Sequence, residues 1–262
     1  MWDVSLRQLN CYKIMFFMGL VDMVQLTFSS FIPGVLSMTG SVLCPEQINW
    51  NRLCAVTAWG CWCIYSGVSV MLAADRFMQD RSDTCQVFDR AKLYIWMFIC
   101  VLYGCVQTLI HLTPLANYGY DAYRGQYVPG QSPIGFQLLL IHNIGVVVIL
   151  SALYTATVVR YKRKLSAIRR TVKPETRMAV RSLLYTSMIV CSLTAMAALG
   201  YISAPFINRY WPFEPSFLTL AQIAWQAISG GVETFYSPAL NAFYPSRAGP
   251  MSQFEFLAWE NA

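Results

Sequence analysis

Acidic side chains inside long apolar stretches are the residues of this chain whose type and position could do chemistry. Asp22 lies in the middle of one apolar run, and Glu233 lies beside a Gly-Gly pair in another. A carboxylate is costly to place in lipid, so each should face the interior of a helix bundle, as an ion site or a conformational switch. The plainer interpretations are a hydrogen-bonded acid that only packs at Asp22, and a helix-end acid that reaches for water at Glu233.

A second candidate is the acid–arginine pair Asp75-Arg76, which ends another apolar run and precedes Phe77. The two side chains could hold each other or release the arginine, and such a lock is worth more when it is partly buried. Spacing alone favours the plainer interpretation, an ordinary charge pair at the end of a membrane span.

Histidine and tryptophan side chains could line a ligand pocket at the opposite ends of the apolar runs. His111 lies near the end of one run, His142 lies about two turns into the next, and Trp59 and Trp62 precede Asp75 on a third. An outward-facing pocket is one interpretation. Packing, with each histidine satisfied by a neighbour, is the commoner role of such residues.

The sequence carries no signature of an enzyme or a metal site. It lacks a Gly-rich phosphate loop, a His-Glu-x-x-His motif and a nucleophile elbow. Most of the nine cysteines lie in apolar runs, where thiols pack as small apolar groups. Cys61-Trp62-Cys63 has neither a second cysteine pair nor a histidine nearby, as zinc would require. We therefore expect no catalytic residue, no metal and no cofactor.

The elements that must position these residues are membrane helices. Hydrophobic residues make up 56% of the 262 and charged residues only 12%, against about 25% charged in soluble domains. Each apolar run holds about twenty residues or more, enough to cross a hydrocarbon core of about 30 Å. The runs lie at about 11–38, 52–74, 91–112, 134–159, 180–203 and 216–236. The prediction is an all-α polytopic transmembrane bundle of about six helices in residues 1–241, with a cytoplasmic tail in 242–262.

Two proline-containing segments interrupt this pattern. Pro33-Gly34 falls late in the first run and is expected to kink or end that helix. The connection Thr113–Pro133 contains three prolines and several glycines, so it is expected to be irregular.

The distribution of lysine and arginine orients the bundle. Only Arg52, Arg124 and Arg209 fall on one side, and the other sixteen of the 19 cations fall on the opposite side, nine of them between Arg160 and Arg181. Cations concentrate in cytoplasmic loops, so the larger group should face the cytoplasm. The net charge of +6 then reflects topology rather than a nucleic-acid partner.

Three stretches of the first eighty residues carry a family likeness. They are Cys11-Tyr12-Lys13-Ile14-Met15-Phe16-Phe17-Met18-Gly19 followed by Asp22-Met23, Gly40-Ser41-Val42-Leu43-Cys44-Pro45, and Trp59 to Arg76, which ends in Leu-Ala-Ala-Asp-Arg. In them the chain resembles the nematode serpentine receptors, a group of seven-transmembrane G-protein-coupled chemoreceptors, and most closely serpentine receptor class T. The layout matches over nearly the whole chain.

The resemblance assigns roles to residues. It implies that Asp22, Asp75 and Arg76 form a signalling switch, and that the arginine opens toward a heterotrimeric G protein. Ser237-Pro238-Ala239-Leu240-Asn241 stands where rhodopsin-like receptors carry Asn-Pro-x-x-Tyr, which adds Ser237, Pro238 and Asn241 to the switch. The residues implied to contact the G protein are Arg160, Arg163, Lys164, Arg169 and Arg170.

Some features depart from the family pattern. A seven-helix receptor begins outside the cell, whereas the charges place this N-terminus inside, so the family's first helix is expected to be absent from this sequence. Cys44 matches an outer cysteine of the family, but Thr113–Pro133 lacks the usual partner cysteine. The Cys-Trp-x-Pro pattern of the sixth helix is also missing from 180–203.

The expected function is that of a chemosensory receptor in the plasma membrane of sensory cells. It would bind a small molecule from outside and signal to a heterotrimeric G protein, with the lipid bilayer as its surroundings. A six-helix transporter or channel that uses Asp22 and Glu233 remains an alternative, although no inverted repeat is visible. A non-functional truncated receptor is the other.

Overall fold

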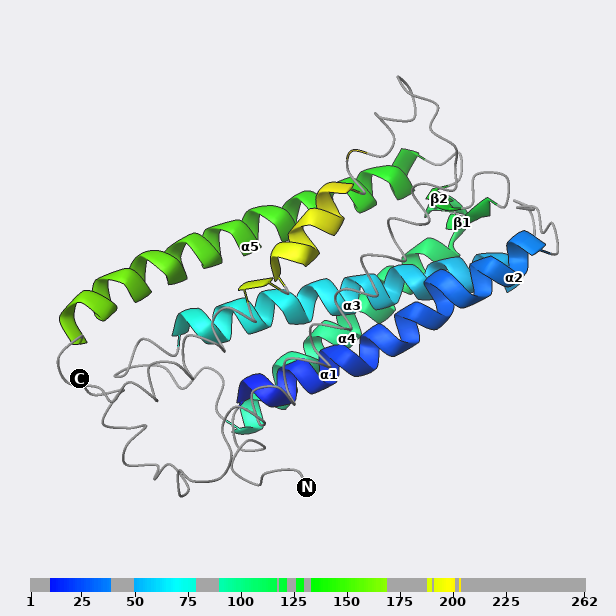
Figure 1. The fold of residues 1–262 in the computed structure, drawn as a ribbon. Coiled ribbons are helices and arrows are strands. Elements are labelled where there is room, and N and C mark those ends of the chain that lie inside the picture. The colour runs from blue at the N-terminus through cyan, green and yellow to red at the C-terminus, as the bar shows by residue number, and fades with distance from the viewer. Residues whose placement is uncertain are drawn as a thin grey trace.

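The computed structural model describes residues 10–38, 50–78, 90–116, 118–121, 126–129, 133–168, 188–189, 191–200 and 203. Its helices are α1 (Asn10–Leu26), which continues through a π-helical turn (Thr27–Phe31) into α2 (Ile32–Met38), then α3 (Trp50–Met78), α4 (Arg90–Leu112) and α5 (Pro133–Ile168). Two short strands, β1 (Tyr118–Asp121) and β2 (Gln126–Pro129), lie between α4 and α5 in the chain. Figure 1 shows the long helices lying side by side.

Within the described residues, four helical stretches are long and apolar enough to cross a membrane. They are Lys13–Val35, Trp50–Met78, Lys92–Leu112 and Ile134–Arg160, and a shorter apolar helix covers Cys191–Gly200. The prediction of an all-α, polytopic membrane bundle is thereby confirmed. The predicted helix 216–236 and the tail 242–262 lie outside the described residues.

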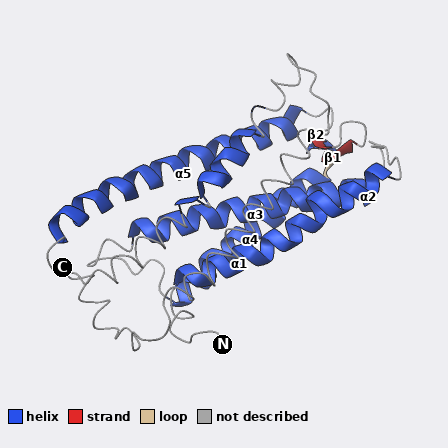
Figure 2. Ribbon diagram, in the orientation of Figure 1, coloured by secondary structure: helices blue, strands red, loops and turns tan. Residues whose placement is uncertain are grey.

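Successive long helices run in opposite directions, so the bundle has two distinct ends. The start of α1, the end of α3, the start of α4 and the end of α5 lie together at one of them (left in Figure 1). Lys13, Arg76, Lys92 and Arg160 belong to these segments, and we name this the basic end. The strands lie at the other (Figure 2), which we name the hairpin end.

The core of the bundle follows α3, which packs against α1, α4 and α5. Most of its side chains are buried along its whole length. The outer helices instead expose large apolar side chains, such as Phe98 on α4 (65% exposed) and Ile141 on α5 (67%). Such surfaces are stable in lipid and costly in water, which matches the membrane assignment.

Glycine allows α3 and α4 to approach closely. A Cβ atom on Gly60 would lie 2.0 Å from Thr108 Oγ1, and one on Gly104 would lie 2.8 Å from the Gly60 carbonyl oxygen and 2.3 Å from Ile64 Cγ1. Small residues at a helix crossing let the two backbones approach and pack closely. This packing matters most in lipid, where the hydrophobic effect does not drive helices together.

Arg52 fastens the start of α3 to the end of α4. Its guanidinium donates hydrogen bonds to the carbonyl oxygens of Leu112 (2.7 Å) and Thr113 (2.8 Å). The last carbonyls of a helix have no partner within the helix, so a cation there satisfies them.

Pro33 neither ends nor breaks the first helix, because a π-helical turn precedes it. In this turn the Ile32 N–H donates to the Thr27 carbonyl, so the carbonyl of Phe28 loses its α-helical donor. The donor one residue further along would be Pro33, which has no N–H. The hydroxyl of Tyr127, on β2, donates to the Phe28 carbonyl instead.

The connection between α4 and α5 is more ordered than expected. It contains a 3-10 turn (Pro114–Ala116) and an antiparallel hairpin in which Tyr118 faces Pro129. Tyrosine and valine favour strands, and β1 packs on α3, which gives the hairpin a surface to fold against. The expectation of an irregular segment is therefore wrong for these residues.

Candidate functional site

His142 on α5 joins three helices through its two ring nitrogens. Nδ1 lies 2.8 Å from the Tyr103 hydroxyl on α4, and Nε2 lies 3.0 Å from Ser66 Oγ on α3. The Ser66 hydroxyl also lies 3.1 Å from the Cys63 carbonyl oxygen, which can only accept. We assign the Ser66 proton to that carbonyl, so that Ser66 accepts from Nε2–H of His142. Nδ1 then accepts from Tyr103. This assignment describes a ring with a single proton, on Nε2.

Aromatic rings surround this histidine at the hairpin end. The ring centroid of Trp59 lies 5.4 Å from that of His111, 5.4 Å from that of His142 and 6.0 Å from that of Tyr118. Tyr118 in turn stacks on Tyr127 at 6.2 Å. We name these five rings and Tyr103 the aromatic cluster. Residues from α3, α4, α5 and both strands meet in it.

Two polar atoms of the cluster, Trp59 Nε1 and His111 Nε2, have no hydrogen-bond partner among the described residues. Trp59 is 4% exposed, and within the described residues its buried Nε1–H has no hydrogen-bond partner. Buried donors in native proteins are almost always satisfied, so this N–H can donate to an acceptor on a bound molecule or to a water.

Three of the four predicted pocket residues meet in this cluster. The ring of Trp59 contacts the rings of both His111 and His142. Trp62 instead donates through Nε1 to Asn143 Oδ1 (3.0 Å). Sequence reasoning missed Tyr103 and the hairpin tyrosines. No local pattern marks them, because each meets the site only through the packing of separate elements.

Asp22 faces the bundle interior, as the cost of a carboxylate in lipid requires. It is 2% exposed, and Gln25 and Ser29 are buried on the same face of the first helix. Ser29 Oγ donates to the Gln25 carbonyl (2.5 Å). Among the described residues Asp22 Oδ1 has no hydrogen-bond partner, so this carboxylate oxygen can still accept a hydrogen bond. Its role in a switch stays a prediction.

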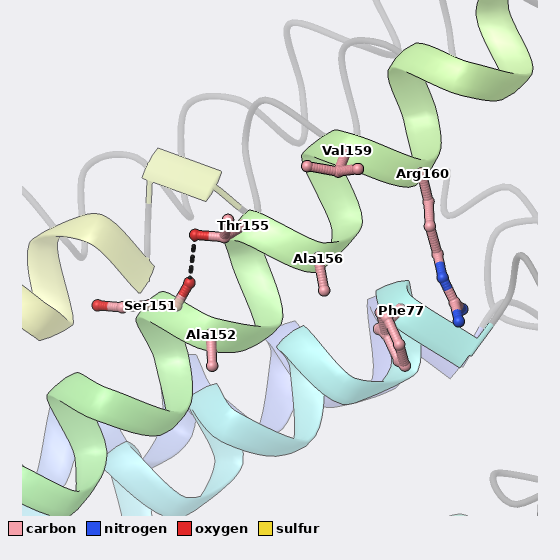
Figure 3. Close-up of a pocket in the computed structure, with 7 residues that line it drawn as sticks. All are labelled: Phe77, Ser151, Ala152, Thr155, Ala156, Val159 and Arg160. Carbon is pink, nitrogen blue, oxygen red and sulfur yellow. Dashed lines mark hydrogen bonds between the residues drawn. The ribbon is translucent and has the colours of Figure 1, made fainter.

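The predicted switch at the basic end lies beside an open groove. Asp75 is buried, whereas Arg76 and Phe77 are partly exposed. The Arg160 guanidinium carbon lies 4.0 Å from the centroid of the Phe77 ring, and Figure 3 shows this side chain reaching from α5 toward α3. A groove of about 620 Å³ follows α5 from this contact to Ser151.

Other predicted residues cannot be placed in the site. Arg163 and Lys164 lie on α5, in its last turns. The remaining ones fall outside the described residues: Cys44, Arg169, Arg170, Glu233, Ser237, Pro238 and Asn241.

Comparison with known proteins identifies relatives. A family profile described as serpentine type 7TM GPCR chemoreceptor Srt matches residues 1–242. The chain is 23% identical over 240 residues to Serpentine receptor class T-55 of Caenorhabditis elegans, a match that covers 89% of this chain and 62% of that relative. The chain thus spans less than two thirds of the length of this curated protein. No solved structure matches it.

Proposed function

Because the chain belongs to the serpentine 7TM chemoreceptor family Srt, we propose that it binds a small molecule from outside the cell and signals to a heterotrimeric G protein. One observation carries this proposal. The 29-residue helix α3 bears Trp59 of the aromatic cluster toward the hairpin end and Asp75-Arg76 at the basic end. A single rigid element therefore connects a candidate ligand site to a candidate signalling site.

The aromatic cluster supports binding of a small molecule with aromatic or apolar surface and a hydrogen-bond acceptor. Its rings offer flat apolar faces, and Trp59 Nε1–H offers the donor. A ligand that shifts Trp59 also shifts His142, whose ring lies at 5.4 Å. His142 bonds to Tyr103 and Ser66, so the shift reaches α3 and α4.

The basic end supports G-protein binding. A buried acid next to a partly exposed arginine can exchange between two arrangements, one of which presents the arginine to a partner. A ligand that binds one arrangement of the helices more tightly would change their populations by its difference in affinity. The coupling to a heterotrimeric G protein that the family resemblance implies is consistent with such a change in populations.

Ligand-driven guanine-nucleotide exchange in membranes tests the proposal. A broad odorant panel should include a compound that raises exchange, and Arg76→Ala should abolish that rise while ligand binding persists. Lys92→Ala is the matched control, because Lys92 is an exposed cation at the same end. If no compound raises exchange by a chain that reaches the membrane, or if both variants behave alike, the proposal fails.

One observation favours a transporter as the second candidate. Asp22 is buried inside a membrane span with Oδ1 unsatisfied among the described residues, as a proton or ion site would be. Ion flux in proteoliposomes that Asp22→Asn abolishes would favour this function over signalling.

A further inference from the structure

The groove at the basic end is lined by one face of α5. Ser151, Ala152, Thr155 and Ala156 recur there at helical spacing, and Figure 3 shows the two alanines pointing toward α3. Their small side chains leave the space between the helices open. The Thr155 hydroxyl donates to the Ser151 carbonyl of its own helix (2.7 Å), so it needs no hydrogen-bond acceptor on a bound molecule. The wall is thus mostly apolar toward whatever fills it.

The length of the groove matches one leaflet of a bilayer. Its lining on α5 extends from Ser151 to Arg160, and nine helical steps cover about 13 Å at about 1.5 Å each. Half of a hydrocarbon core is about 15 Å. An extended acyl chain in the inner leaflet would therefore lie along the whole wall.

Arg160 closes the groove at the level of lipid headgroups. The Phe77 ring covers one face of its guanidinium, and this stacking leaves the in-plane N–H donors directed away from the ring. Those donors match two phosphate oxygens at once. Arg160 also begins the stretch of nine lysines and arginines that ends at Arg181, and basic segments of this kind attract anionic lipids.

We propose that this groove binds an anionic glycerophospholipid of the cytoplasmic leaflet, with its phosphate on Arg160 and one acyl chain along Ser151–Ala156. The charge of the opening, the apolar wall and its one-leaflet length all favour a lipid over a free phosphate, which would use only Arg160. Arg160 is also one of the residues implied to contact the G protein, but lipid binding to this groove can be measured without a G protein.

Native mass spectrometry of the detergent-purified chain, titrated with phosphatidylserine or phosphatidylcholine, tests this site. We expect phosphatidylserine to bind about tenfold more tightly, because it carries a net negative charge toward Arg160, whereas the choline cation of phosphatidylcholine offsets the charge of the same phosphate. Arg160→Gln should remove that preference, and Arg160→Lys should keep part of it. Ala156→Phe should weaken both lipids by filling the groove.

Matched controls separate the groove from general attraction. Lys13 lies 5.6 Å over the Tyr94 ring, also at the basic end, so Lys13→Gln removes a similar cation and should leave the preference within about twofold. Val148→Phe adds bulk on a part of α5 that is 60% exposed and should change neither affinity. Helical circular dichroism and a single gel-filtration peak verify the fold of each variant.

Three results would overturn the proposal. They are equal binding of the two lipids by the unchanged chain, equal losses in Arg160→Gln and Lys13→Gln, and binding that Ala156→Phe leaves unchanged. If inorganic phosphate competes for the site in Ala156→Phe as strongly as in the unchanged chain, the site binds a free anion instead of a lipid. If the groove is protected from solvent only when a G protein is added, its occupant is a protein.

Discussion

His142 shows how one side chain sets the chemistry of the aromatic cluster. With the Ser66 proton assigned to the Cys63 carbonyl, His142 Nε2 is the donor and Nδ1 is the acceptor. Hydrogen bonds thus run in one direction, from Tyr103 through His142 to Ser66. A ligand that breaks one of them leaves a ring nitrogen of the half-buried His142 without its partner, which lowers the stability of this arrangement.

The proton position of His142 can be measured directly. The chain has two histidines, so a His111→Gln variant labelled with ¹⁵N-histidine reports on His142 alone. We expect the spectrum of a neutral ring protonated at Nε2. A ring protonated at Nδ1, or at both nitrogens, would contradict the assigned direction of the hydrogen bonds.

Removing one donor from this chain should weaken the bundle. Tyr103→Phe leaves Nδ1 of His142 without its donor, so the free energy of unfolding in detergent should fall by about 1 kcal/mol. In a His142→Phe background the same change should cost much less, because the acceptor is already gone. Equal costs in the two backgrounds would show that the 2.8 Å contact contributes nothing.

Sequence reasoning identified residue types at this scale but not their partners. Trp59, His111 and His142 were foreseeable because polar rings are uncommon in apolar runs. Tyr103 and Ser66 were not, since 39 and 76 residues separate them from His142 in sequence. Only the crossing of three helices brings the three side chains together.

At the scale of elements, the π-helical turn and the hairpin depend on each other. The turn leaves the Phe28 carbonyl without a backbone donor, and Tyr127 supplies one. A bulge in a helix often marks a place where function uses irregular backbone, and here it joins the first helix to the strands that cover the aromatic cluster.

Tyr127→Phe should lower the free energy of unfolding by about 1 kcal/mol, the value of one hydrogen bond to a carbonyl. Pro33→Ala restores a backbone N–H in this stretch, so the tyrosine should matter less in that background. A double-mutant cycle by thermal unfolding in detergent measures the coupling. Additive effects would mean that the hairpin is held by packing alone.

The glycine contact between α3 and α4 should tolerate no added methyl group. Gly104→Ala should destabilise by about 1–3 kcal/mol, the usual cost of overpacking, because the Gly60 carbonyl lies 2.8 Å from the new Cβ. Gly145→Ala on α5 is the control, since nothing lies within 4 Å of its Cβ. Equal unfolding temperatures for both variants would show that the helices do not touch here.

Long apolar runs were enough to locate the four long helices that the structure describes, but not their irregularities. The predicted 91–112 and the observed Arg90–Leu112 differ by one residue at one end, whereas α5 continues to Ile168 instead of ending near 159. Hydropathy marks where lipid ends, and a helix can continue into water beyond it. The hairpin was missed because its two strands are short and depend on α3 for support.

At the scale of the whole molecule, orientation decides what each end can do. The charge bias predicts that the basic end faces the cytoplasm. Under the proposed function, the aromatic cluster then faces the outside, from which a ligand would arrive, and Asp75-Arg76 would face a G protein. The anionic-lipid groove needs the same orientation, because inner-leaflet lipids carry most of the negative charge. Every proposed activity depends on this one arrangement.

Labelling of single introduced cysteines in intact cells tests that arrangement most directly. Thr113 and Lys92 are exposed at the hairpin end and the basic end. A membrane-impermeant thiol reagent should label Thr113→Cys in intact cells and Lys92→Cys only after permeabilisation, each above the background of the unchanged chain. Labelling of Lys92→Cys in intact cells, with Thr113→Cys protected, would contradict the account.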